Sequence, residues 1–393
     1  MYDTRFFKHA INIGRFMREF LMYLYRIKSK TSVSTMMLTA LAVFNPDFSG
    51  QLHAETLSFL PKVDYSVGFN PTAVSIGDIN SDGKPDIVAG IDDSHVAVLL
   101  GKGNGGFLAA VDYPAASSPN SVQVGDFNDD GKADIVTANS HTNNVSILLG
   151  KGAGVLAAKM DYPVGITPKA VAVADINYDG KLDLVTANKD GNNVGVLLGK
   201  GDGSFLTKVN YPAAANSIAI GDMNNDGKPD LVTGSNGLVS ILFNKGNGTF
   251  APKLDYSADG GRTAIGDMNH DGKLDLLTIS NKNANEVGVL LNQGNKVFSA
   301  PVYYSTGGPP DSPYLGDVNL DGKLDIVTTN QVDNSVSVLL GKGNGTFFPK
   351  LDYATGLYPE RLAIADLNYD GKPDIVVENS NDTTVSVLLN NSK

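Results

Sequence analysis

The chain lacks cysteine and tryptophan altogether, and it has only five histidines among 393 residues. Without cysteine it can form neither a disulfide nor a thiolate metal site, so an exported protein of this composition depends on its core or on hard metal ions. The scarcity of basic residues, 31 against 42 acidic ones for a net charge of −11, argues against a nucleic-acid partner. Hydrophobic residues make up 42% of the chain, which excludes general disorder.

The sequence also lacks the usual catalytic motifs. Neither G-x-S-x-G nor H-E-x-x-H occurs. His95, His141 and His270 lie in different parts of the chain, so they form no local constellation. The glycine-rich turns lack the spacing and the following helix of a phosphate-binding loop, and they are interpreted as hairpin turns.

Residues 1–54 differ from the rest of the chain. They carry a net charge of +4, which leaves −15 for the remainder. Lys28 and Lys30 precede the apolar residues 33–44, a pattern that predicts a signal peptide or N-terminal export segment and a secreted, cell-surface or periplasmic protein. The apolar run is shorter than the ~20 residues of a membrane span, so no span is expected in the mature chain.

Two alternatives remain for this segment. Translation starting at Met22 would give a signal peptide of more ordinary length. An uncleaved amphipathic anchor would instead use the apolar side chains of Phe6, Phe7, Phe16, Phe20 and Leu21.

One nine-residue string, D-x-N-x-D-G-K-x-D, dominates the remaining sequence. Its copies begin at Asp78, Asp126, Asp175, Asp222, Asp267, Asp317 and Asp366, at intervals of 45–50 residues. Self-similarity at such a period indicates a repeat architecture in which each repeat is one supersecondary unit.

Each repeat contains four short runs typical of β-strands. In the first repeat these are residues 73–77, 86–89, 96–100 and 107–113, with β-branched residues, alternation and turn residues between them. Four strands repeated seven times predict an all-β fold, a seven-bladed β-propeller formed by residues 55–393 as a single domain. The last repeat ends after its third strand, so we expect residues 59–65 to complete the last blade and close the ring.

The repeated string has the donor set of a calcium loop. In the first copy, Asp78, Asn80 and Asp82 present side-chain oxygens, and the following glycine allows a turn that brings the backbone carbonyl of Lys84 to the ion. The ammonium of this lysine is expected to point to solvent. Asp86 closes the site, because the loop lacks the glutamate that an EF-hand carries at its twelfth position. The predicted ligands of up to seven Ca²⁺ ions are Asp78, Asn80, Asp82, Lys84, Asp86, Asp126, Asn128, Asp130, Lys132, Asp134, Asp175, Asn177, Asp179, Lys181, Asp183, Asp222, Asn224, Asp226, Lys228, Asp230, Asp267, Asn269, Asp271, Lys273, Asp275, Asp317, Asn319, Asp321, Lys323, Asp325, Asp366, Asn368, Asp370, Lys372 and Asp374.

Metal-free turns are the alternative, since Asp, Asn and Gly favour turns on their own. Three carboxylates in each loop repel one another, however, which favours a bound cation. Magnesium fits less well than calcium because it sheds its waters reluctantly. Seven Ca²⁺ ions would bring the charge of −15 to about −1, so the acidity of the chain does not indicate a basic partner.

These loops and the Gly-Asn-Gly-Thr-Phe turns at residues 246–250 and 343–347 resemble the FG-GAP/VCBS repeat family, which includes the propeller of integrin α-subunits. The resemblance covers residues 57–389 and implies calcium at all seven loops. Asparagine as second ligand, where the family often has aspartate, implies somewhat weaker affinity. The turns at residues 152–156 and 294–298 depart from the family pattern.

The resemblance does not fix one function, because family members serve adhesion, sugar binding and, as accessory domains, enzymes. Our prediction is a non-catalytic binding or adhesion module for glycans or proteins. The alternative is a polysaccharide-acting, lyase-like enzyme that uses calcium with a lysine or tyrosine base.

Strand order places the aspartate loops and glycine turns on one face of the ring and the remaining loops on the other. The loops of the second face vary between repeats, as in residues 90–95, 187–193, 280–286 and 305–313. We expect ligand binding on this face; the alternative is that these loops merely tolerate variation.

A rival site is the variable fourth position of the aspartate loops. Some side chains at this position could stack on a sugar, although exposed filler residues are favoured. The residues there are Ser81, Asp129, Tyr178, Asn225, His270, Leu320 and Tyr369.

Overall fold

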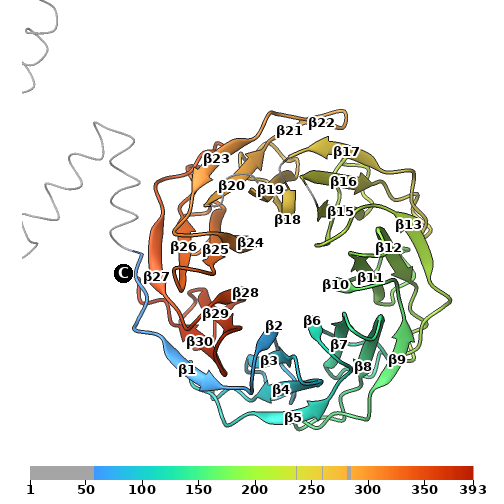
Figure 1. Cartoon of the computed structure of the whole chain (residues 1–393), viewed down its shortest axis with the longest axis vertical. Helices are drawn as coiled ribbons and strands as arrows, with labels where there is room; N and C mark the ends of the chain where they lie inside the picture. The colour runs from blue at the N-terminus through green and yellow to red at the C-terminus, as the bar shows by residue number, and fades with distance from the viewer. Residues whose placement is uncertain (1–56, 236, 259, 281–284, 393) are drawn as a thin grey trace, which may run out of the picture. The chain divides into compact units, whose positions relative to one another are not determined.

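The computed structural model describes residues 57–235, 237–258, 260–280 and 285–392, so the predicted export segment lies outside the described residues. The unit Thr56–Lys393 is described by itself. This unit is a ring of seven four-stranded antiparallel sheets (Figure 1), which confirms the predicted seven-bladed propeller. Among the described residues, no helix is long and apolar enough to cross a membrane.

The blades are numbered here from the first complete one along the chain. Blade 1 contains β2 (Pro71–Gly77), β3 (Asp86–Ile91), β4 (His95–Leu99) and β5 (Val111–Pro114); blade 2 contains β6 (Pro119–Gly125), β7 (Asp134–Asn139), β8 (Asn144–Leu148) and β9 (Met160–Pro163). Blade 3 contains β10 (Pro168–Ala174), β11 (Asp183–Asn188), β12 (Asn193–Leu197) and β13 (Val209–Pro212); blade 4 contains β14 (Ala219–Gly221), β15 (Asp230–Ser235), β16 (Leu238–Leu242) and β17 (Leu254–Ser257). Blade 5 contains β18 (Gly260–Gly266), β19 (Asp275–Ser280), β20 (Glu286–Leu290) and β23 (Val302–Ser305); blade 6 contains β24 (Pro310–Gly316), β25 (Asp325–Asn330), β26 (Ser335–Leu339) and β27 (Leu351–Ala354). Blade 7 contains β28 (Pro359–Ala365), β29 (Asp374–Asn379), β30 (Thr384–Leu388) and, as its fourth strand, β1 (Val63–Ser66).

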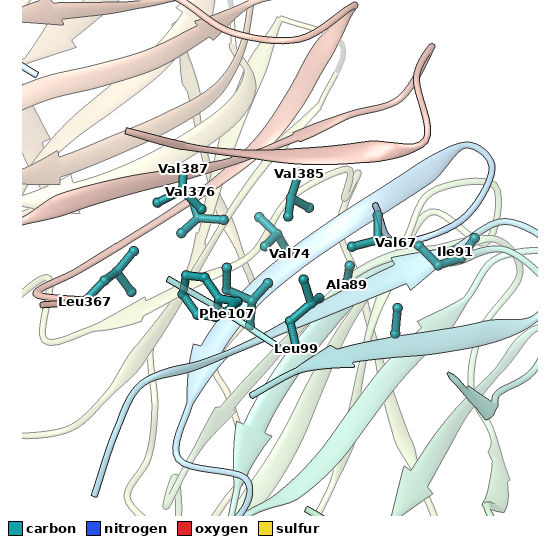
Figure 2. Close-up of a cluster of buried hydrophobic side chains, with 12 residues drawn as sticks. Val67, Val74, Ala89, Ile91, Leu99, Phe107, Leu367, Val376, Val385 and Val387 are labelled. Atoms are coloured by element: carbon teal, nitrogen blue, oxygen red, sulfur yellow. The ribbon is translucent and has the colours of Figure 1, made fainter. Parts of the chain in front are cut away.

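The hydrophobic core lies between neighbouring blades. In Figure 2, Val74, Leu99 and Phe107 of blade 1 belong to one buried cluster with Val376 and Val387 of blade 7. The second strand of a blade is buried along its whole length, as in β3, because a neighbouring blade covers each of its faces. The outermost strands, such as β5, are mostly exposed.

The N-terminal strand closes the ring as predicted. Val63 to Ser66 pair antiparallel with β30, and the backbone N–H of Asn391 donates to the carbonyl of Ser58 at 2.9 Å. A side-chain hydrogen bond reinforces the pairing, since Ser386 Oγ donates to Asp64 Oδ1 at 2.7 Å. Closure therefore combines a backbone ladder with a polar side-chain contact.

The predicted fourth strand is longer than the observed one. Residues 107–113 were expected to form it, but β5 begins at Val111, and Phe107 makes a single bridge with Gly101. The ring of Phe107 packs edge-on against Tyr65 of the preceding blade, with 5.3 Å between the ring centroids. This segment therefore joins two blades and does not extend the fourth strand. The same pairing recurs as Tyr162–Phe205, Tyr211–Phe250, Tyr256–Phe298 and Tyr304–Phe347.

The glycine turns also differ from a tight Asn-Gly hairpin. In blade 1 the positive φ angles fall on Gly103 and Gly105, and the turn is closed by a hydrogen bond from the Lys102 N–H to the Gly106 carbonyl. Residues 294–298, which lack the repeat pattern, instead contain the two-residue turn of the hairpin formed by β21 (Asn292–Gly294) and β22 (Val297–Phe298).

Candidate functional site

The aspartate loops join the inner strand of each blade to its second strand. The last aspartate of each loop, at position nine, is completely buried. In blade 1, Asp86 Oδ2 accepts the Ile79 N–H at 2.8 Å and its Oδ1 accepts the Gly101 N–H at 2.7 Å. The loop and the glycine turn therefore share one face of the ring, as predicted. Equivalent bonds are made by Asp134, Asp183, Asp230, Asp275, Asp325 and Asp374.

The remaining loop side chains bond to the backbone of their own loop. Asp78 Oδ1 and Oδ2 accept the N–H groups of Asp82 and Gly83 at 3.0 and 2.8 Å, and Asn80 Oδ1 accepts the Asp82 N–H at 2.9 Å. This is the Asx-turn geometry of the metal-free alternative. Within the described residues, no three acidic or histidine groups are arranged to hold an ion. The oxygens that accept these hydrogen bonds belong to the predicted calcium ligands, so the turn and a bound ion would use the same side chains.

The lysine of the loop is placed differently from the prediction. We expected its ammonium to point to solvent, but Lys84 Nζ lies 2.9 Å from Asp82 Oδ2. The reason is electrostatic, because the ammonium neutralises one of the crowded carboxylates. The hydrogen bond with Lys84 lowers the pKa of Asp82, and the same contact raises the pKa of Lys84. The same pair forms between Lys132 and Asp130, Lys228 and Asp226, Lys273 and Asp271, Lys323 and Asp321, and Lys372 and Asp370.

The loop carboxylates nevertheless influence one another. Burial, together with the charges of Asp179 and Asp175, raises the pKa of Asp183 to about 6. In blade 6, burial together with Asp321 and Asp317 raises the pKa of Asp325 to about 7. Each loop thus holds a negative charge that the fold does not fully neutralise. Its donors are all oxygens with unused lone pairs, which is the chemistry that a hard divalent cation takes.

The fourth loop position has left-handed backbone in every copy. Its φ angle is positive whatever the residue: 60° for Ser81, 55° for Asp129, 62° for Tyr178, 58° for Asn225, 59° for His270, and 60° for both Leu320 and Tyr369. Side chains at this position also reach the next loop of the ring. The hydroxyls of Tyr178 and Tyr369 donate to the carbonyls of Gly227 and Gly83, and Asn225 Nδ2 donates to the Gly272 carbonyl at 2.9 Å. The expectation of mere filler residues is therefore wrong for these three positions, which link neighbouring blades.

Leucine is poorly suited to this backbone, which costs an L-residue about 1–2 kcal/mol unless it is glycine, asparagine or aspartate. Leu320 has a φ of 60° and is 57% exposed, so its side chain contributes little packing. We expect Leu320→Asn to raise the free energy of unfolding by about 1 kcal/mol, measured by urea denaturation. Val332→Asn is the control, because Val332 is 64% exposed without a positive φ, and an equal gain there would show that backbone strain is not the cause.

The inner strands surround a cavity of about 360 Å³ at the centre of the ring. All seven blades line it, through residues near the start and middle of each inner strand, so it lies nearer the face opposite the aspartate loops. Its lining includes Lys169, Arg262 and Arg361 with polar groups such as Ser121 and Asn216. The sequence prediction missed this site. Its only sequence signal was that Lys169, Arg262 and Arg361 stand at inner-strand positions that are uncharged in most other repeats.

The variable loops are partly described. Residues 281–284 of the predicted loop 280–286 lie outside the described residues. Three loops that lead into inner strands expose an apolar side chain at the same position, two residues before the proline that begins the strand. Phe69 is 74% exposed, Ile166 57% and Leu357 52%. These loops lead into inner strands whose residues line the cavity.

Comparisons with known proteins place the chain in a family. The FG-GAP-like repeat matches residues 78–137, 126–186, 175–233, 222–278, 267–328 and 317–377. These matches together span most of the chain, and the protein belongs to the FG-GAP-like repeat family. No curated protein matches the chain by sequence.

Several solved structures share the fold. A lectin from Agrocybe aegerita, described as recognising non-reducing terminal N-acetylglucosamine, is 16% identical with a TM-score of 0.53, covering 83% of this chain and 97% of the lectin. BBS1N in complex with ARL6DN is 9% identical with a TM-score of 0.59, covering 84% and 96%. A streptogramin B lyase is 14% identical with a TM-score of 0.56, covering 85% and 98%. At these identities the likeness concerns the fold alone.

Proposed function

We propose that this protein is an exported binding module for glycans or proteins, stiffened by calcium on one face of its propeller and binding its ligand on the other. The observation that carries the proposal is the difference between the two faces. The aspartate face repeats the same hydrogen bonds in every blade. The opposite face combines variable loops, three exposed apolar side chains at one loop position, and the approach to the central cavity.

The three exposed apolar side chains favour ligand binding by the variable loops over the alternative that these loops merely tolerate variation. Single exposed apolar residues are ordinary on protein surfaces. Phe69, Ile166 and Leu357, however, occupy the same position in three loops that each lead into a cavity-lining strand. An aromatic ring such as that of Phe69 also suits stacking on a sugar. The similar fold of a lectin and of a protein in complex with a partner shows that a propeller can serve either kind of ligand.

A glycan array tests the proposal directly. We expect the calcium-loaded protein to bind a defined glycan class and the triple variant Phe69→Ser, Ile166→Ser, Leu357→Ser to lose that binding by tenfold or more, since each buried apolar side chain contributes about 1.5–3 kcal/mol. The matched control is Val155→Ser with Leu320→Ser, which removes exposed apolar side chains from the aspartate face.

Unchanged binding by the triple variant would contradict the assignment of the ligand face. If the array is blank, pull-down with host or neighbouring surface proteins and the same variants applies the test to a protein ligand. A product assay on the array hits separates binding from lyase activity, because a lyase would release unsaturated fragments from the bound glycan.

A further inference from the structure

The charged residues that line the central cavity are cations, although the chain as a whole is acidic. The protein has a net charge of −11, yet the residues that line the cavity include three cations, Lys169, Arg262 and Arg361, and no carboxylate. The three come from blades 3, 5 and 7, so they are far apart in sequence and meet only because the ring closes. Their positions hold uncharged residues in most other repeats, such as Asn216 and Ser121.

One carboxylate beside the cavity lining, that of Asp311, is shared by two of these cations. Arg262 Nη1 forms an ion pair with Asp311 Oδ2, and Arg361 Nη1 lies 3.4 Å from the same oxygen. Each guanidinium has five N–H donors, so a single carboxylate cannot satisfy both. Arg361 Nη2 adds one long bond of 3.4 Å to the Asn120 carbonyl, and Lys169 Nζ bonds the neutral side-chain oxygen of Asn120.

Two further acids, Glu360 and Glu378, lie near the three cations. Burial raises the pKa of Glu360, raises the pKa of Glu378 well above its ordinary value and lowers the pKa of Lys169, so it favours the neutral forms of all three groups. Glu378 Oε1 accepts a hydrogen bond from the backbone N–H of Arg361 at 3.0 Å, while Glu378 Oε2 is buried without a hydrogen-bond partner. Among the residues that line the cavity, the charged groups are all cations, and the two guanidinium groups that share Asp311 keep N–H donors for a ligand.

We propose that the central cavity binds a small carboxylate ligand, either a sugar acid or an open-chain organic acid, whose carboxylate is held by Arg361, Arg262 and Lys169. Planar guanidinium groups match a carboxylate through two parallel hydrogen bonds, and they do so best where water is partly excluded. A volume of about 360 Å³ suits a molecule of monosaccharide size and lies at the small end of ligand pockets.

This proposal rests on the proposed function, because an acidic sugar at the end of a bound glycan is one source of such a carboxylate. The two remain separable. The entry-loop variant Phe69→Ser, Ile166→Ser, Leu357→Ser leaves the three cavity cations in place, so it should still bind a small carboxylate after losing glycan binding.

Isothermal titration with three probes tests the cavity. D-glucuronate and succinate represent the two sources, and D-glucose is the uncharged match of glucuronate. We expect at least one of the two carboxylates to bind the calcium-loaded protein at one site, and glucose to bind at least tenfold more weakly than glucuronate if the sugar acid is the ligand. Lys169→Met should weaken the carboxylate about ten- to hundredfold, since a hydrogen bond to a charged group contributes about 1.5–3 kcal/mol.

Two further variants keep the test decisive. Ser312→Leu fills the cavity without removing a charge, and it should also abolish binding. Lys151→Met, which removes an exposed lysine from the glycine-turn face, should bind like the unaltered protein. Absence of binding by both carboxylates, or equal binding by Lys169→Met and Ser312→Leu variants that melt like the unaltered protein, would overturn the proposal.

Discussion

Removing calcium is expected to lower the melting temperature of this protein by on the order of 20 °C or more. A ligand that binds only the folded state stabilises it by about 2.7 kcal/mol per site when its free concentration is 100 times its Kd, and several sites add. For a domain of this size, each kcal/mol corresponds to roughly 2 °C. The measurement is differential scanning calorimetry with and without excess chelator, with Mg²⁺ added back as a second metal. Unchanged melting in chelator would mean that the loops act as metal-free turns.

Substitutions in one loop distinguish a bound ion from the internal hydrogen bonds. Asp78→Asn should reduce the number of bound Ca²⁺ ions by one, whereas Asp333→Asn, which alters an exposed aspartate of the opposite face, should not change it. Lys84→Met should affect the calcium affinity of the loop and the stability of the metal-free protein in opposite directions. It removes the ammonium from Asp82, so it should raise calcium affinity in that loop but destabilise the metal-free protein.

The pH dependence of the metal-free protein follows from the ninth-position aspartates. The pKa of Asp183 is about 6 in the folded protein and that of Asp325 about 7, both above the ordinary value of 3.8. The folded state then binds more protons than the unfolded state, so metal-free stability should rise as the pH falls from 7 to 5. The calcium-loaded protein should show the reverse trend, because protons compete with the ion for the carboxylates.

The repeat period made most of the fold predictable. Seven copies of one loop with four strand-like runs between them fix the number of blades, and the missing last strand of the seventh repeat identified residues 59–65 as the closing segment. The start of the outer strand was not predictable in the same way. Phe107 follows the strand pattern locally, but its ring packs on Tyr65 of another blade, a contact that no local pattern encodes.

The candidate sites were predictable only where the residues are close in sequence. Each aspartate loop is contiguous, so its donor set could be named in full, although the hydrogen bonds between Lys84 and Asp82 depend on charge balance that a residue count does not reveal. The central cavity could not be foreseen, because Lys169, Arg262 and Arg361 are brought together only by closure of the ring. Tyr369 and Gly83, at opposite ends of the repeat array, are joined for the same reason.

Deleting the closing strand is the second change with a large expected effect. A chain that begins at Val67 loses β1, the ring contact of Phe59 with Tyr353 at 4.8 Å, and the buried Leu57. Burial of Leu57, Phe59 and Tyr65, whose ring packs on Phe107, contributes roughly 5 kcal/mol or more, which is comparable with the whole stability of many domains. We expect this chain to lose cooperative melting and to associate through the exposed edge of β30, as seen by calorimetry and size-exclusion chromatography.

A chain that begins at Thr56 is the matched control, and it should melt cooperatively because it keeps every contact of the closing strand. A synthetic peptide of residues 57–66 supplied in trans should restore part of the melting transition of the deleted chain, since Ser58, Asp64 and the β1 ladder provide specific contacts to β30 and the residues after it. The hydrophobic contacts alone would not select this peptide. A scrambled peptide of the same composition should therefore fail, and equal rescue by both peptides would show that simple coverage of an apolar edge, instead of the native register, closes the ring.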